Sequence, residues 1–502
     1  MRKKLITIWI LLLFVLSIYG QSTAGDNLFD DSFLHEIRFE NADTNTFITT
    51  KDYQQLKMII DETVVDSIGF KRKGNVSFYH NPNKLGIKVK TNKYVNGRKY
   101  DGIKEFMLNI NFQDPSMLRE KLTYDICTGM GLYSLRTAFA KVYINDEYWG
   151  LYTLVEGKDE MFKQVFDNRD MDAIESLDFG DMCYISNNSN DYDINNNGGM
   201  PTYQFENGDE LTAWPKFALM IDKANNTPDD QYLDTVQKYL NLEHFFLYQA
   251  INVYLMNMDS YIGFKGNQIY FYDDIEDRWQ IMPWDFNASF GLWNTNNYSP
   301  ATYDMIPEAI SDGCIADKIN NINQLKYYYL DAMCRINQTC GDTNSYFSKI
   351  DTWKELIRQA VYDDTRKHIT NAEFDMATEY GYYLLFNENL PALKTFIKER
   401  LAIVQQELID LNYSCQTDNI NEIYKTSSFK VFPNPAKSSI IIEFDGNINK
   451  EIEFKILNIT GQVVFHISEF RKEINIEDLK AGVYILLLQS DSINYTRKLI
   501  KQ

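Results

Sequence analysis

The last 74 residues of the chain form a unit that can fold by itself. A polar stretch, residues 412–428, separates them from the rest, and short β-type runs then alternate with turns to the end of the chain. These runs are Ile440–Phe444, Ile452–Leu457, Val463–Ile467, Val483–Leu488 and Thr496–Ile500. We therefore predict a small all-β domain over residues 429–502, joined by a linker to a main domain over residues 30–411.

The main domain is expected to be of the α+β class. Residues 30–110 alternate short apolar runs with turns, which indicates a β-rich beginning. Helical periodicity marks residues 114–130, 230–257 and 318–411. Further strands are predicted at Thr137–Ile144, Gly150–Val155, Asn267–Tyr272 and Trp279–Pro283. The large helical second half disfavours an all-β adhesin.

Residues 1–20 have the composition of a secretory signal peptide. Arg2, Lys3 and Lys4 precede the apolar run Leu5–Tyr19, and Gly20-Gln21-Ser22 offers a cleavage site. The run is too short for a comfortable membrane span, and no later segment reaches about 18 consecutive apolar residues. We expect the mature chain to be exported and to contain no membrane span.

Charge and cysteine spacing exclude several classes of protein. The formal net charge is −20, and removal of the basic leader brings it to −23. Such a surface repels nucleic acid and anionic lipid but accepts basic partners or divalent cations, although many secreted proteins are acidic for no specific purpose. The six cysteines show no CxxC spacing, and none of the five histidines lies at ligand spacing from them, which disfavours a zinc site.

Residues 255–291 carry the residues most suited to chemistry. Asp259 follows a helix and enters a loop, Asn267 begins a strand, and Asp285 follows a second strand. Phosphoryl transfer needs a carboxylate to orient the attacking hydroxyl, and an amide and a carboxylate to hold Mg²⁺. By themselves, these residues are better explained as turn formers or helix caps.

Several motifs resemble, in order, those of the spore coat protein H (CotH) family of atypical secreted kinases. The main one is KGNQIYFYDDIEDRWQIMPWDFNASFG, residues 265–291. The upstream ones are Lys73–Ser77, Phe106–Asn109, Asp114–Arg119 and Tyr143–Glu156, so the motif core spans about residues 70–291. The resemblance implies an atypical two-lobed protein-kinase-like domain. It also implies transfer of the γ-phosphate of ATP to protein hydroxyls, with Mg²⁺ or Mn²⁺ as cofactor.

The resemblance assigns roles around the metal. Asp259 would be the catalytic aspartate, Asp285 a metal ligand and Asn267 a second ligand. The family's Trp-Asp-x-Asp stretch ends here in Asn287, which offers the metal an amide oxygen without a charge, so weaker metal binding is expected. The segment Gly180–Ile185 also lacks a lysine that is common in the family.

The resemblance also places residues on the nucleotide side. A lysine of the strand at residues 84–90 would contact the phosphates, with Lys84 preferred and Lys88 as the second choice. Arg119 and Glu156 would be polar residues near the nucleotide, or alternatively a salt-bridged scaffold pair.

The tail resembles the type A C-terminal sorting domain of the type IX secretion system of Bacteroidetes. The similar segments are Phe432–Ala436, Asn458–Val464, Leu479–Tyr484 and Lys498–Lys501. The resemblance implies a β-sandwich, the type IX secretion machinery as a partner, and export through the periplasm. The protein would then be secreted or attached to the outer surface.

Two other functions stay open. One is a surface structural or adhesive protein with weakened activity on the same fold, which Asn287 favours. The other is a carbohydrate-binding or carbohydrate-degrading surface protein, for which no carboxylate pair can be assigned. Asp193–Gly198 matches the first half of a calcium loop, but Gln204 stands at the twelfth position, so an Asn-rich loop is the better explanation.

Overall fold

A computed structural model describes most of the chain. It covers residues 24–415, apart from 75–80, 167–170, 178, 197–202, 264–265, 294–298 and 386–387. It also covers residues 430–501, apart from 433, 435, 444–452, 459–462, 468–470, 481 and 491–492. The predicted signal peptide and residues 416–428 of the predicted linker lie outside the described residues.

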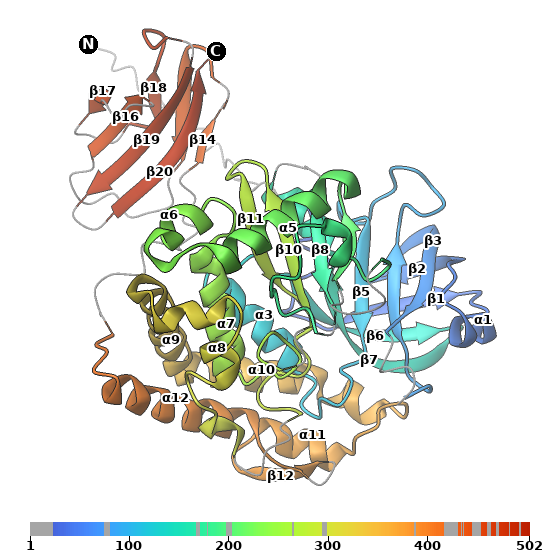
Figure 1. Ribbon diagram of the computed structural model, residues 1–502. Coiled ribbons are helices and arrows are strands. Elements are labelled where there is room, and N and C mark those ends of the chain that lie inside the picture. The colour runs from blue at the N-terminus through green and yellow to red at the C-terminus, as the bar shows by residue number, and fades with distance from the viewer. Residues whose placement is uncertain are drawn as a thin grey trace, which may run out of the picture.

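Seven strands near the N-terminus close into a barrel, drawn in blue to cyan in Figure 1. In barrel order these are β1 (His35–Glu40), β2 (Gln54–Ile60), β3 (Thr63–Lys73), β4 (Gly86–Lys90), β5 (Glu105–Asn109), β7 (Glu147–Glu156) and β6 (Thr137–Ile144). A parallel pairing of β1 with β6 closes the barrel, and the short helix α1 (Thr44–Thr49) lies between β1 and β2 in sequence. The β-rich beginning predicted from the sequence is therefore confirmed.

The two faces of strands β3 and β4 differ in chemistry. Phe70 and Val89 point into the barrel and are fully buried. On the other face Lys71 lies opposite Lys88, and Lys73 follows at the end of β3. Because directly paired residues of antiparallel strands share a face, the outside of the barrel carries a row of lysines.

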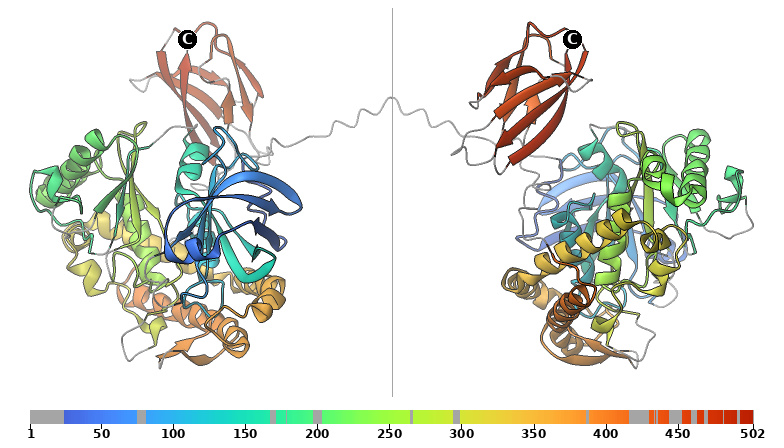
Figure 2. Two further views of the ribbon diagram at one scale, coloured as in Figure 1. Left: turned by 90° about the vertical axis from the view of Figure 1, so that its right-hand side faces the viewer. Right: turned by 60° about the vertical axis from the view of Figure 1, so that its left-hand side comes forward.

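The helical part follows the barrel and contains a second, four-stranded sheet (Figure 2). The sheet has the order β11 (Arg278–Pro283), β10 (Gln268–Asp273), β8 (Ala173–Ser176) and β9 (Tyr203–Asn207). The helices are α3 (Arg119–Gly129), α4 (Lys158–Val165), α5 (Glu210–Asn226), α6 (Tyr232–Val236), α7 (Leu242–Tyr254), α8 (Glu308–Ser311), α9 (Asn323–Gly341), α10 (Thr343–Asp363), α11 (Asn371–Thr378) and α12 (Leu393–Asp410). A small hairpin, β12 (Tyr382–Leu385) and β13 (Glu388–Pro391), precedes α12.

Three predicted helical segments differ from the observed ones, and in the predicted stretch 318–411 the hairpin of β12 and β13 separates α11 from α12. The helix predicted at 114–130 begins only at Arg119, because the Asp114 carboxylate accepts from the backbone N–H groups of Ser116 and Arg119, each at 2.9 Å, and holds a turn. The helix predicted at 230–257 is two helices, α6 and α7. Between them the backbone of residues 239–241 pairs with Trp279 of β11.

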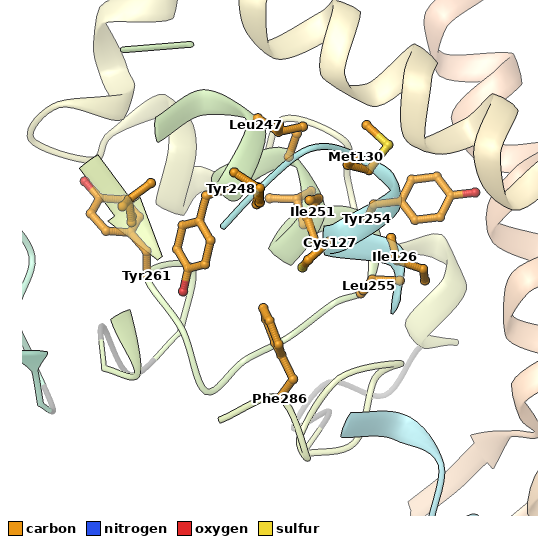
Figure 3. Close-up of a cluster of buried hydrophobic side chains, with 14 of the residues drawn as sticks. Ile126, Cys127, Met130, Leu247, Tyr248, Ile251, Tyr254, Leu255, Tyr261 and Phe286 are labelled. Carbon is orange, nitrogen blue, oxygen red and sulfur yellow. The ribbon is translucent and has the colours of Figure 1, made fainter. Parts of the chain in front are cut away.

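A buried apolar core joins α3 to α7 and to the segment after β11. Ile126 and Cys127 of α3 lie beside Ile251 and Leu255, and the Phe286 ring points toward them (Figure 3). The rings of Phe286 and Tyr124 lie 5.3 Å apart, edge to face. Phe286, the residue directly after Asp285, is thus fixed in the core. This fixes the backbone position of Asp285 at the edge of the core.

Asp364, at the end of α10, attaches the helical part to the barrel. Its Oδ2 accepts from the Lys84 ammonium at 2.6 Å and from the backbone N–H of Leu151 at 3.1 Å. Its Oδ1 caps the next turn through backbone N–H groups at 2.9 Å. Gly150 has a φ of 120°, and a Cβ there would lie 2.2 Å from Asp364 Oδ2, so this approach requires glycine.

Two disulfides lie within the helical part. Cys183 pairs with Cys314, and Cys334 of α9 pairs with Cys415, whereas Cys127 and Cys340 are buried thiols. A small loop closed by Cys334 and Cys340 is not formed. The Cys334–Cys415 bond ties the chain just beyond α12 back to α9.

The C-terminal unit is all-β, as the sequence predicts. One sheet contains β14 (Lys430–Phe432), β15 (Ser439–Glu443) and β18 (Glu473–Asn475). The other has the order β17 (Val463–Ile467), β16 (Glu453–Asn458), β19 (Gly482–Ser490) and β20 (Ile493–Lys501). Ile440 and Ile474 of the first sheet share an apolar core with Ile456 and Leu486 of the second. Among the described residues, no helix is both long and apolar enough to cross a membrane.

Candidate active site

The loop after α7 and the start of β10 bring Asp259 and Asn267 together. The Asn267 side-chain amide donates to the backbone oxygen of Asp259 at 3.1 Å, and the Asp259 N–H donates to the side-chain oxygen of Asn257 at 3.3 Å. Asn267 and Asp285 both have a φ of 55°, in the left-handed region that non-glycine residues seldom adopt. Such conformations concentrate at functional sites, where the surrounding structure maintains them.

A charged cluster, formed by Lys73, Asn109, Glu120 and Asp285, lies between the barrel and α3. The Lys73 ammonium donates to the Asn109 amide oxygen, and the Asn109 amide nitrogen donates to Glu120 Oε1 at 2.7 Å. Glu120 is only 1% exposed. The charges of Lys73, Glu120 and Asp285 act on one another, so the three side chains form one electrostatic unit.

Burial dominates the ionisation of this cluster. Burial raises the pKa of Glu120 to about 8, and the nearby charge of Asp285 adds to the rise while Lys73 opposes it. Burial likewise raises the pKa of Asp285, against the effect of Lys73. Glu120 is buried while Lys73 and Asp285 are partly exposed, and two carboxylates that share one lysine in such a place are costly to ionise together, which is typical of sites prepared for a cation or a reaction.

A second ion-paired group lies at the junction that follows β7. The Lys158 ammonium is 2.7 Å from Glu206 Oε1 and 3.2 Å from Glu175 Oε2. It also lies 4.5 Å from the centre of the Trp284 ring, while the Lys73 ammonium lies 5.7 Å from the same ring. Trp284 therefore connects this group to the charged cluster, one residue before Asp285.

The two predicted phosphate-binding lysines have different surroundings. Lys84 is 1% exposed, and its ammonium binds Asp364 and the backbone oxygen of Leu151. The structure thus brings Lys84 to the attachment at Asp364 and not to Asp285. Lys88 pairs with Glu105 at 2.6 Å on the outer face of the barrel, where its charge also acts on Lys73.

Sequence reasoning missed Lys73 and Glu120 as site residues. Lys73 is the first residue of the quoted Lys73–Ser77 motif, whose residues 75–77 lie outside the described part. The sequence feature that could have pointed to Lys73 is its position at the end of a strand, directly before Gly74. Glu120 is the neighbour of the predicted Arg119, and only the phase of α3 shows which of the two faces the cluster.

Arg119 and Glu156 are both held by scaffold ion pairs, but not with each other. The Arg119 guanidinium lies 2.5 Å from Asp114 and donates to the Tyr383 hydroxyl at 2.8 Å. Glu156, 1% exposed, lies 2.6 Å from the Arg136 guanidinium. The alternative role, a residue held in a salt bridge of the scaffold, therefore fits both Arg119 and Glu156. Each of them pairs with a different partner.

Asn287 and Asp193 each have local hydrogen bonds. The Asn287 amide nitrogen donates to the backbone oxygen of Phe112 at 3.2 Å, which leaves its oxygen as the possible metal ligand. Asp193 accepts from Asn195 and Asn196 within its own turn, at 2.7–3.0 Å. These bonds support an Asn-rich turn at Asp193 and require no calcium ion.

The residues present fit a hard divalent cation. Asp285 would supply a carboxylate, and Asn267 and Asn287 would supply amide oxygens, which are the ligand types that Mg²⁺ and Mn²⁺ prefer. The pairing of these groups with a nearby lysine matches what the binding of a metal and phosphates requires.

Arg400 of α12 holds two segments that flank the site. Its guanidinium donates to the backbone oxygens of Tyr254 at 3.1 Å and Val253 at 3.4 Å, at the C-terminal end of α7. It also donates to Ala301 at 3.2 Å and to Tyr303, in the segment that follows Asp285. Arg400 is fully buried, so it satisfies helix-end carbonyls that water cannot reach.

Replacing Arg400 by methionine is expected to lower the free energy of unfolding by about 3 kcal/mol, because buried carbonyls lose a charged donor. Arg400→Lys is expected to restore little of the lost free energy of unfolding, since one ammonium group cannot donate to the carbonyls of both segments. Urea denaturation measures the effect. Arg358, which forms exposed ion pairs on α10, is the control, and Arg358→Met should cost less than about 1 kcal/mol. Equal losses in the two variants would contradict the role of Arg400.

The fold and the site together define an α/β protein in which a strand barrel and a helical part enclose a lysine–carboxylate cluster. Residues 70–404 match the sequence model of the family described as CotH kinase protein. The chain belongs to this family. Residues 430–502 match the secretion system C-terminal sorting domain, which indicates export and surface attachment by the type IX system.

Similar proteins with curated names are spore coat proteins and invasins. Inner spore coat protein H of Bacillus subtilis is 26% identical over 260 residues, which cover 49% of this chain and 68% of that protein. Invasin CotH2 of Rhizopus delemar is 23% identical over 297 residues, which cover 57% of this chain and 49% of the invasin. The chain therefore spans about half the length of the fungal relative.

Proposed function

We propose that this chain is an exported, surface-attached protein kinase that transfers the γ-phosphate of ATP to hydroxyl groups of protein, with Mg²⁺ or Mn²⁺. The observation that carries the proposal is the cluster of Lys73, Glu120 and Asp285, whose charges act on one another. Membership of the CotH kinase protein family supports it. The barrel and the helical part would act as the two lobes of a kinase-like fold.

The side chains have distinct tasks in this proposal. Asp259 accepts the proton of the acceptor hydroxyl and orients its oxygen for attack. Asp285, Asn267 and Asn287 hold the metal, which neutralises phosphate charge when bound. Lys73 contacts the phosphates, and Lys88 adds positive potential on the same barrel face. The bond from Asn267 to the Asp259 backbone keeps the catalytic loop next to the metal ligands.

The test is transfer of γ-³²P from ATP, by the chain without its first 20 residues, to itself and to a generic basic protein. Asp259→Asn and Asp285→Asn are each expected to lower transfer by about 10²–10³-fold or more, because each removes a group acting on the reacting atoms. Retained transfer in both variants would contradict these roles. A wild-type chain that neither transfers phosphate nor shows an ATP-induced thermal shift with Mg²⁺ or Mn²⁺ would overturn the proposal.

A second candidate is a surface adhesive or structural protein with weakened activity on the same fold. Asn287 in place of an acid favours it, and relatives carry the names invasin and spore coat protein. Asn287→Asp separates the two candidates. A rise in metal affinity together with new phosphate transfer, from an inactive wild type, would favour the weakened protein.

A further inference from the structure

We propose that Glu120 is a ligand of the divalent cation, shared with Asp285, and is not the ion-pair partner of Lys73. The inference deepens the proposed function and rests on it for the presence of a metal. It starts from the two oxygens of one buried carboxylate, which have different surroundings.

The first oxygen of Glu120 is used by the scaffold. Oε1 accepts from the Asn109 amide nitrogen at 2.7 Å, and the amide oxygen of Asn109 accepts from Lys73. The amide thus stands between the ammonium and the carboxylate. Because Asn109 fixes both side chains, Lys73 can keep its position without binding Glu120 directly.

The second oxygen of Glu120 is buried and, among the described residues, has no hydrogen-bond partner. A buried carboxylate oxygen without a donor costs free energy, and proteins retain such an atom mainly where a ligand satisfies it. The carboxylate of Asp285 is close enough to act on Glu120 electrostatically. The orphan oxygen therefore belongs to a carboxylate that lies within electrostatic reach of a second acid, Asp285.

The charges of the cluster favour a cation over another hydrogen-bond donor. Glu120 and Asp285 carry two negative charges when ionised, and Lys73 supplies one positive charge. A divalent cation bound by both carboxylates satisfies the orphan oxygen and removes the repulsion between the acids. Lys73 is then left for the phosphates, which need a positive group beside the metal.

The test measures Mn²⁺ binding by calorimetry and by electron paramagnetic resonance, without nucleotide, on residues 21–502. Glu120→Gln and Asp285→Asn are each expected to weaken Mn²⁺ affinity at least about tenfold. Glu156→Gln is the control, because Glu156 is equally buried but paired with Arg136, and its Mn²⁺ affinity should stay within about twofold of wild type. A melting curve of each metal-free variant completes the comparison.

The metal-free melting temperature separates the two roles of Glu120. If Glu120 is a metal ligand, Glu120→Gln keeps or raises the metal-free melting temperature, since the amide keeps the shape of the side chain and its oxygen can still accept from Asn109. If Glu120 is the partner of Lys73, the substitution lowers it and leaves Mn²⁺ affinity unchanged, which would overturn the inference. Glu120→Asp keeps the charge but withdraws the oxygens toward α3, so it should also weaken Mn²⁺ binding even if Glu120→Gln does not fold.

The outcomes also separate this inference from the proposed function. Phosphate transfer that depends on Asp259 and Asp285, together with wild-type Mn²⁺ affinity in Glu120→Gln, would overturn the inference and leave the kinase proposal standing. A wild-type chain that binds no Mn²⁺ at millimolar concentration would overturn the inference and the metal requirement together.

Discussion

Asp364→Ala is expected to lower the free energy of unfolding of the main domain by about 3–5 kcal/mol, because it leaves a buried ammonium without its counter-charge. Lys84 is 1% exposed, and Asp364 is its carboxylate partner at 2.6 Å. The substitution also removes the acceptor for the backbone N–H of Leu151. The helical part should therefore separate from the barrel at a lower urea concentration than in wild type.

Tryptophan fluorescence measures this change selectively. The C-terminal unit contains no tryptophan, so urea denaturation followed in this way reports on the main domain. Glu147→Ala is the control, since its ion pair with Arg366 is exposed and should contribute less than about 1 kcal/mol. The double variant Lys84→Met/Asp364→Leu is expected to recover only part of the loss, because an apolar pair replaces the ionic one but the backbone N–H groups that Asp364 binds stay without an acceptor. A loss below 1 kcal/mol in Asp364→Ala would contradict the importance of this attachment.

Lys73→Met is expected to lower phosphate transfer by about 10²–10³-fold, since it removes a positive group proposed to act on the phosphates. Its stability should fall less than that of Lys84→Met, because the substitution breaks one hydrogen bond to Asn109 and the acids that lose its charge have raised pKa values and can take up a proton. Lys84→Met should show the opposite pattern, with a large loss of stability from an unpaired Asp364. Initial rates at several ATP concentrations, with urea denaturation of the same preparations, measure both effects.

The activity and stability of Lys73→Met and Lys84→Met together distinguish which lysine binds the phosphates. A folded Lys84→Met variant without transfer, next to an active Lys73→Met variant, would return the phosphate-binding role to Lys84. A stability loss shared equally by the two variants would contradict the assignment of Lys73 to the site. Lys88→Met serves as the intermediate case, because Lys88 acts on Lys73 only through its charge.

Local motifs show which candidate residues lie close together when those residues are near in sequence, but not when they are distant. Asp259 and Asn267 lie eight positions apart, and a hydrogen bond from the Asn267 side chain to the Asp259 backbone oxygen joins them, so the motif itself brings them together. Lys84 could not be placed in the same way, because its partner Asp364 is 280 positions away. Only the folded chain shows which lysine of neighbouring strands faces the acids and which is held elsewhere.

Helix phase and helix breaks limited the rest of the prediction. Arg119 and Glu120 are adjacent, and the motif favoured Arg119, but the first turn of α3 directs Glu120 toward Asn109 and Arg119 toward Asp114. The helix predicted at 230–257 breaks because Asn241 caps α7 and the preceding backbone pairs with β11. The apolar spacing on both sides of the break continues, so periodicity could not reveal it.

The Cys334–Cys415 disulfide has a mechanical consequence for a protein held at a surface by its C-terminus. Tension on the linker first meets Cys415, and the covalent bond passes that tension to Cys334 in the middle of α9. The end of α12 at Asp410 is therefore shielded from peeling, and with it Arg400, which holds the segments around the site. The disulfide therefore diverts a pulling force from α12 to α9. A force on the linker should leave the geometry of the charged cluster unchanged.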